Sequence, residues 1–259
     1  MRLLLIRHGD PDYIHDTLTE KGEKEAELLA DMISRQQHID SIYVSPLGRA
    51  RKTASYTEEK IRKRAIVEDW LQEFPGILDI NDSQNLQRAY SDTPKKPDGT
   101  YRNRIFWDML PSAWSTQPEY LDNQGWRESE IGRTSGLNEL YDSVTGSLDR
   151  LLADYGYERD GKIYHVCEAN TKTVALFCHF GVSCVLLSHI WNVSPFILWH
   201  CLGMQPSSLT ELVTEERQEG TASFRCLRVG DISHLCASGE KPSFMGRFCE
   251  TYANKEQRH

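Results

Sequence analysis

The stretch LLLIRHG, residues 3–9, places four apolar residues directly before an arginine, a histidine and a glycine. A short apolar run closed by polar residues predicts a buried strand that ends in a loop. Residues 10–12, DPD, continue that loop. His8 is therefore expected just beyond the carboxyl end of the first strand.

The segments that follow alternate between helical and strand patterns. Thr19 and Ser45 are the expected helix caps, with Pro46 at the first helical position. The predicted elements are a helix from Thr19 to Ile33, a strand at 41–44, a helix from Ser45 to about Arg62 and a strand beginning at 66–67. Strands and helices that alternate through short links predict a parallel sheet.

The pattern changes between residues 79 and 136. Four of the ten prolines fall here, together with Trp107, Trp114 and Trp126. So much aromatic content argues against a disordered linker, and we expect an irregular cap inserted into the α/β domain. Its tryptophans are expected either to line a substrate pocket above the sheet or to fill a small core of a stabilising flap.

Regular patterns return after the insertion. The predicted elements are a helix from Leu137 to Leu152, a strand at 174–178, a buried helix at 182–191 and strands at 208–213 and 224–229. The expected fold is one α/β domain over residues 1–259, with a mostly parallel sheet flanked by helices on both faces. The tail from 239 to 259 shows no pattern.

Two of the predicted strands end in a histidine, His8 and His179. Parallel strands place their carboxyl ends at one edge of a sheet, where ligands bind. Arg7 precedes His8, and Arg49 lies in the first turn of the helix after another strand. Guanidinium groups and a helix N-terminus suit a phosphate dianion. Arginines beside His8 would keep its ring neutral, as a nucleophile requires.

Several of these segments, taken in order, resemble the histidine phosphatase superfamily, also called phosphoglycerate-mutase-like. The matching segments are Arg7-His8-Gly9, Leu18-Thr19 with Gly22, the SPLGRA run at 45–50 with Thr53-Ala54, Leu71-Gln72-Glu73 and His179. The resemblance covers residues 1–75 and about 137–235. It implies that His8 forms phosphohistidine, that Arg7, Arg49 and His179 hold the phosphoryl oxygens, and that Glu73 donates the proton. It also implies that neither a metal nor a cofactor is needed.

Departures from the family pattern favour its phosphatase branch. Residues 10–14 read DPDYI, where mutases carry a Trp-Asn pair, so phosphoglycerate-mutase-type transfer becomes the alternative. Phe180 follows His179, where acid phosphatases and phytases carry the aspartate that donates the proton. The donor is therefore expected near Glu73, with Glu68, Asp69 and Asp79 as competing carboxyl groups.

Composition limits the partners. The chain carries 30 basic and 38 acidic residues, a net charge of −8, which argues against a nucleic-acid binder. Seven cysteines without a C-x-x-C pair predict neither a disulfide framework nor a zinc knuckle. The apolar run at 3–6 is too short for a signal peptide or a membrane span. We expect a cytoplasmic enzyme for a small phosphorylated substrate, and the sequence leaves its oligomeric state open.

Two further hypotheses remain at this stage. The loop residues His8, Asp10, Asp12, His15 and Asp16 are ligands that could hold a divalent ion, as in a metal-dependent hydrolase. A non-catalytic protein that binds a phosphorylated ligand would keep the same arginines and histidines. Turnover that survives chelation would separate the expected phosphatase from both.

Overall fold

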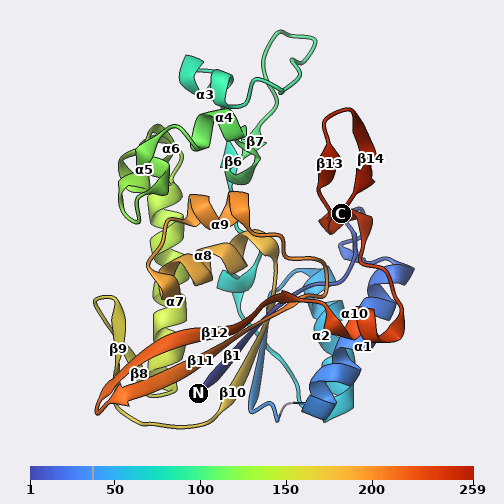
Figure 1. Cartoon of the computed structure of the whole chain (residues 1–259), viewed down its shortest axis with the longest axis vertical. Coiled ribbons are helices and arrows are strands. Elements are labelled where there is room, and N and C mark those ends of the chain that lie inside the picture. The colour runs from blue at the N-terminus through green and yellow to red at the C-terminus, as the bar shows by residue number, and fades with distance from the viewer. Residues whose placement is uncertain (37) are drawn as a thin grey trace. The chain divides into compact units, whose positions relative to one another are not determined.

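The computed structural model describes residues 1–36 and 38–259 (Figure 1). The chain divides into two compact units. The first unit comprises Met1–Glu73, Leu151–Ser183 and Gly203–His259, and the second comprises Phe74–Arg150 and Cys184–Leu202.

An eight-stranded sheet forms the centre of the first unit. Its strands, in spatial order, are β5 (Ile66–Val67), β4 (Ser41–Val44), β10 (Thr173–Cys178), β1 (Arg2–Arg7), β11 (Leu209–Gln218), β12 (Thr221–Asp231), β9 (Ile163–Val166) and β8 (Tyr157–Asp160). The strands from β5 to β1 run parallel, and each strand from β11 onward is antiparallel to its neighbour. The expected α/β class is confirmed, and the sheet is mixed.

The antiparallel half of the sheet follows from two tight turns. Gly220 joins β11 to β12 with a φ of 72°, and Gly161 joins β8 to β9 with a φ of 56°. Glycine adopts positive φ without steric penalty, which is what short hairpin loops require. In the parallel half, Arg7 lies opposite Cys178, so β1 and β10 end at the same edge.

Two helices of the first unit, α1 (Glu20–Gln36) and α2 (Gly48–Ile61), pack together and against the parallel strands (Figure 1). Their shared core is apolar because each helix presents one apolar stripe to the sheet. It contains Leu4, Ile6, Leu29, Ile33, Ile39, Ile42, Val44, Ala50, Ala54, Ala175, Phe177 and Leu209.

The two predicted helix caps have different outcomes. The hydroxyl of Thr19 accepts a hydrogen bond from the Gly22 N–H at 3.1 Å, which confirms it as the cap of α1. The predicted cap at Ser45 is wrong, because α2 begins at Gly48 and Leu47 precedes it without a capping side chain. The hydroxyl of Ser45 lies instead 2.8 Å from Nε2 of His179.

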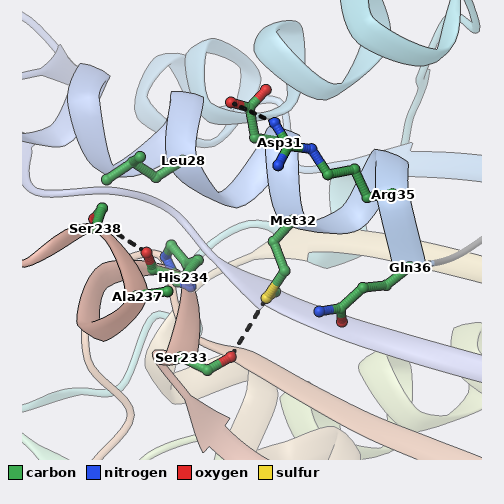
Figure 2. Close-up of a pocket in the computed structure, with 9 residues that line it drawn as sticks. All are labelled: Leu28, Asp31, Met32, Arg35, Gln36, Ser233, His234, Ala237 and Ser238. Carbon is green, nitrogen blue, oxygen red and sulfur yellow. Dashed lines mark hydrogen bonds and ion pairs between the residues drawn. The ribbon is translucent and has the colours of Figure 1, made fainter.

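A short helix, α10 (Ser233–Ser238), packs beside α1 in the first unit. A pocket of about 420 Å³ lies between them (Figure 2). Its lining includes Met32 and Ser233, whose side chains meet at 3.5 Å. His234, one of the lining residues, is itself buried, and its Nε2 lies 2.9 Å from the Ser207 hydroxyl.

The remaining elements of the first unit are short. They are β2 (Pro11–Asp12), β3 (Thr17–Leu18), the 3-10 turns η1 (Asp69–Leu71) and η4 (Phe244–Gly246), and the hairpin of β13 (Cys249–Thr251) and β14 (Asn254–Arg258). The tail, which showed no pattern in the sequence, is tied to the first unit by two ion pairs. Lys21 and Lys24 each lie 2.7 Å from the carboxylate of Glu240.

The second unit is mostly helical. Its elements are β6 (Ile77–Leu78), α3 (Gln84–Ala89), β7 (Arg104–Ile105), η2 (Phe106–Asp108), α4 (Pro111–Trp114), α5 (Pro118–Leu121), η3 (Gly125–Glu128), α6 (Glu130–Thr134) and α9 (Pro195–Cys201). Two of the four unit boundaries fall within α7 (Leu137–Asp154) and α8 (Phe180–Trp191). These two helices confirm the helices predicted from Leu137 to Leu152 and at 182–191.

The tryptophans of residues 79–136 pack within the second unit. Trp126 is 1% exposed, and its ring lies 4.9 Å from that of Tyr141. Trp114 stacks on His200 at 5.2 Å, and Trp107 lies 5.8 Å from Trp199. These contacts are those of a small aromatic core, while a cap role for this segment stays a prediction.

Candidate active site

Backbone hydrogen bonds fix the loop after β1. The N–H of His8 donates to the carbonyl of Cys178 at 3.1 Å, and the carbonyl of His8 accepts from the Ser207 N–H at 2.9 Å. The Gly9 N–H donates to the Thr53 hydroxyl of α2 at 3.0 Å. Strand β10, the loop before β11 and helix α2 therefore all hold the residues around His8.

The imidazole of His8 is held in one tautomer. Nδ1 lies 2.7 Å from the carbonyl oxygen of Gly9, and a carbonyl only accepts, so Nδ1 carries the proton. Nε2 is left with its lone pair. Burial and the Arg7 charge hold the pKa of His8 well below its ordinary value, with a smaller contribution from Arg49, against the raising effect of the Gly9 bond. The ring is neutral at neutral pH.

His179 lies beside His8, as the parallel strands predict. The two ring centroids are 5.0 Å apart with an angle of 57° between the ring planes. Burial lowers the pKa of His179, and His8, Arg49 and Arg7 lower it further. Its Nε2 contacts Ser45, whereas its buried Nδ1 has no hydrogen-bond partner among the described residues.

Arg7 reaches the same region from the end of β1. Its backbone N–H donates to the carbonyl of Ser208 at 3.0 Å, and its guanidinium donates to the carbonyl of Met204. The guanidinium carbon lies 5.7 Å from the ring centre of Phe180. Phe180 is the residue that departs from the family pattern after His179, and in this chain it packs against the Arg7 cation.

Arg49 is fixed by a carboxylate from another loop. Its Nη1 lies 2.6 Å from Asp16, and the second oxygen of Asp16 accepts the Gly48 N–H at 2.6 Å. Although burial raises the pKa of Asp16, these bonds and the Arg49 charge lower it below its ordinary value. Nε of Arg49 is buried and has no hydrogen-bond partner in the part of the chain that the structure describes.

Glu73 lies at the amino end of the helix that follows His179. Its Oε1 accepts the Val182 N–H in the first turn of α8 at 3.2 Å. Among the competing acids, Glu68 accepts the indole N–H of Trp70 at 2.9 Å, and Asp69 and Asp79 are exposed. Of these four acids, Glu73 is the one whose side chain contacts the helix after His179 in the described part of the chain.

The acidic loop residues after His8 are used separately. Asp12 pairs with His15 at 2.7 Å on the exposed surface, Asp10 accepts the Thr19 hydroxyl at 2.7 Å, and Asp16 holds Arg49. Within residues 1–36 and 38–259, no three histidine, cysteine, aspartate or glutamate side chains are grouped as a metal site would require. The described residues therefore offer no ligand cluster that would support the metal-dependent alternative.

Comparisons with known proteins agree with this geometry. A family model described as the histidine phosphatase superfamily (branch 1) matches residues 3–103. The curated "Phosphoserine phosphatase 1" of Hydrogenobacter thermophilus is 35% identical over 201 residues, which span 74% of this chain and 81% of that protein. The chain belongs to the histidine phosphatase superfamily. The expectation of a hydrolase of phosphate esters is confirmed at the level of this family.

Other known proteins are similar to this chain in sequence or in fold. A "Phosphoglycerate mutase-like protein 4" of Arabidopsis thaliana is 25% identical over 173 residues, 63% of this chain and 65% of that protein. A mutant phosphoserine phosphatase of Entamoeba histolytica, solved with phosphoserine, has a TM-score of 0.56 at 17% identity over 90% of this chain and 98% of that one. A mycobacterial glucosyl-3-phosphoglycerate phosphatase with inorganic phosphate has a TM-score of 0.56 at 21% identity, with the same coverage. No helix in the described residues is long and apolar enough to span a membrane.

Sequence reasoning named the residues at the strand ends but missed those that hold them. The sequence indicates Asp16 only as a candidate metal ligand, and Ser45 as a helix cap and as part of the family motif at 45–50. Their partners, Arg49 and His179, come from other elements. A signal was present for Ser45, because it directly follows a strand predicted to be parallel to the one before His179.

Proposed function

We propose that this histidine phosphatase hydrolyses phosphate monoesters through a phosphohistidine at Nε2 of His8. The observation that carries the proposal is the tautomer of His8. The bond from Nδ1 to the Gly9 carbonyl leaves Nε2 unprotonated in a buried, neutral ring. An unprotonated nitrogen beside two guanidinium groups is suited to attack phosphorus.

Arg7, Arg49 and His179 are the proposed phosphate ligands. Nε of Arg49 and Nδ1 of His179 are buried polar atoms with no hydrogen-bond partner among the described residues, and a bound phosphate would satisfy both. If the Ser45 hydroxyl donates to Nε2 of His179, Nδ1 carries a proton that it can donate to a phosphoryl oxygen. The arginine charges offset the charge of the dianion.

The proposed reaction has two displacements. Nε2 of His8 attacks phosphorus, the bond to the ester oxygen breaks, and Glu73 transfers its proton to the leaving alcohol. Water then attacks the phosphohistidine and loses a proton to Glu73, while the phosphorus–nitrogen bond breaks and its electron pair returns to Nε2. The products are the alcohol and inorganic phosphate.

Small phosphorylated carboxylic acids are the proposed substrates. Relatives of this chain are named for phosphoserine and glucosyl-3-phosphoglycerate, and the Entamoeba phosphatase has also been solved with 3-phosphoglyceric acid. Each of these compounds joins a phosphate ester to a carboxylate. The run 10–14, DPDYI, in place of the Trp-Asn pair of mutases favours hydrolysis over transfer.

Hydrolysis of an aryl phosphate in excess EDTA tests the activity, with His8→Ala as its control. We expect turnover in EDTA and a loss of at least about a thousandfold in His8→Ala, because removal of a nucleophile leaves only binding contributions. A panel of phosphoserine, 3-phosphoglycerate and glucosyl-3-phosphoglycerate then ranks the substrates. Rapid quenching with a ³²P-labelled substrate should trap an acid-labile phosphoenzyme in the wild-type protein alone.

Four outcomes would contradict the proposal. A His8→Ala protein with a near wild-type rate would exclude the phosphohistidine. A rate that appears only after a divalent ion is restored would favour the metal-dependent hydrolase. Phosphate binding without turnover of any panel member would favour a binding protein, and phosphoglycerate isomerisation faster than hydrolysis would favour a mutase.

A further inference from the structure

Helix α1 carries a glutamate on its buried face. Glu25 is 0% exposed, and the other buried residues of the helix are glycine, alanine, leucine and isoleucine. A carboxylate is rarely buried completely unless a specific contact requires it. Its Oε2 accepts the backbone N–H of Asp10 at 2.8 Å, whereas Oε1 has no hydrogen-bond partner within residues 1–36 and 38–259.

The peptide group that Glu25 contacts is the one that orients His8. The Asp10 N–H and the Gly9 carbonyl belong to a single planar peptide. The carbonyl accepts Nδ1–H of His8 at 2.7 Å, and the N–H donates to Glu25 at 2.8 Å. Two hydrogen bonds through one peptide therefore connect the Glu25 carboxylate to the imidazole.

Close packing fixes this connection. A Cβ added to Gly9 would lie 2.6 Å from the Gly22 carbonyl oxygen, and a Cβ added to Gly22 would lie 2.2 Å from that of Asp10. The first turn of α1 thus meets the loop backbone to backbone. Glu25, three residues after Gly22, is held at the distance that its hydrogen bond requires.

We propose that Glu25 is a positioning residue for His8 that acts through the Gly9–Asp10 peptide. A carboxylate that accepts the N–H polarises the peptide and makes the Gly9 carbonyl a stronger acceptor. The stronger acceptor fixes the proton on Nδ1 and raises the basicity of Nε2, as carboxylates do for other imidazoles. The catalytic consequence rests on the proposed function, because it assumes that Nε2 of His8 attacks phosphorus.

The charges around Glu25 make the contact sensitive to pH. Burial raises the pKa of Glu25 to about 7; the Asp10 N–H and Lys21 lower it, while the carboxylates of Asp10 and Glu240 raise it. Asp10 faces it from the loop, Lys21 from α1 and Glu240 from the tail, where Lys24 also pairs with Glu240. Ionised Glu25 is the stronger acceptor, so the activity it supports should increase as the pH rises through about 7.

The test compares Glu25→Gln, Glu25→Leu and the control Glu27→Gln on the exposed face of the same helix. The glutamine keeps an acceptor for the Asp10 N–H but removes the charge. We expect Glu25→Gln to lose the rise in kcat/KM near pH 7, and Glu25→Leu to lower kcat by about tenfold to a hundredfold with KM little changed. Glu27→Gln should match the wild-type profile.

Imidazole ¹⁵N NMR of the full chain provides a readout apart from turnover. We expect the Nδ1–H tautomer of His8 to predominate in the wild-type protein and to lose population in Glu25→Gln. If Glu25→Leu does not fold, this spectrum and the Glu25→Gln profile decide the matter. Unchanged His8 signals, or a Glu25→Gln profile that keeps the rise near pH 7, would overturn the proposal. If the wild-type protein forms no phosphoenzyme, the proposed function fails, while the NMR result still decides the role of Glu25.

Discussion

His8 and His179 are neutral because burial and two nearby guanidinium groups both disfavour the imidazolium form. A neutral ring has a lone pair for attack or a proton to donate, according to the contact that its other nitrogen makes. The Gly9 carbonyl decides this for His8, because a carbonyl only accepts. For His179, the proposed function requires the Ser45 hydroxyl to donate to Nε2. In the proposed function, a single contact at the remote nitrogen thus gives each of these two histidines a different task.

Removal of the Ser45 hydroxyl tests this assignment at His179. Ser45→Ala takes away the partner of Nε2, so Nδ1 is no longer fixed as a donor. We expect the Ki of inorganic phosphate to rise by about tenfold, the value of one hydrogen bond to a charged group. The control is Ser34→Ala, whose hydroxyl donates to the Asp31 carbonyl in α1. Equal Ki values in both variants would contradict the role of Ser45.

Helix α1 determines the position of the loop that follows β1. Thr19 caps the helix and also bonds to Asp10, and Gly22 lets the two backbones touch. The Leu18-Thr19 and Gly22 segment of the family resemblance thus has a physical basis. A side chain at position 22 would separate the helix from the loop that carries His8.

Gly22→Ala is expected to destabilise the protein and lower its activity. Its Cβ would lie 2.2 Å from the Asp10 carbonyl oxygen, a backbone atom that cannot rotate away. We expect a loss of about 1–3 kcal/mol in the free energy of unfolding. Gly146→Ala in α7 is the matched control, because its Cβ would meet only the flexible end of Arg150 at 3.7 Å. It should gain about 0.5–1 kcal/mol; similar losses in both would refute the packing argument.

Elements with a clear local pattern of apolar residues could be predicted from the sequence. The apolar runs before His8 and His179 gave β1 and β10, and parallel pairing brought the two histidines together. The insertion is predicted to be irregular, yet Pro111 and Pro118 each begin a four-residue helix. Proline suits the first helical position because that N–H has no partner within the helix.

Contacts between distant elements could not be predicted in this way. The run EKGEKE at 20–25 is highly charged, and such a run usually forms a solvated helix face. Only the packing of α1 against the loop places Glu25 inside. In the same way, α9 was not predicted, although its aromatic residues complete the core of the second unit.

For the molecule as a whole, the buried ionisable groups couple stability to pH in opposite directions. Burial lowers the pKa of His8 and His179, and it lowers that of His234 to about 4. Buried histidines are neutral when folded and take up protons when unfolded, so their contribution is present above about pH 6.5 and is lost on acidification. Glu25 acts in reverse, because its pKa rises from about 4.5 unfolded to about 7 folded.

Histidines with a lowered pKa, which include His200 as well, outnumber the buried Glu25 carboxyl in this balance. We expect the free energy of unfolding of the wild-type protein to fall as the pH drops from about 6.5 toward 4.5, as denaturant titrations at several pH values would measure. Glu25→Gln removes the opposing group. It should exceed the wild-type stability by on the order of 3 kcal/mol at pH 8, and the difference should vanish toward pH 4.5. A difference that does not change with pH would show that the buried carboxyl does not titrate. A stability gain at pH 8 combined with a loss of turnover would mean that α1 keeps a destabilising charge in the core because His8 requires it.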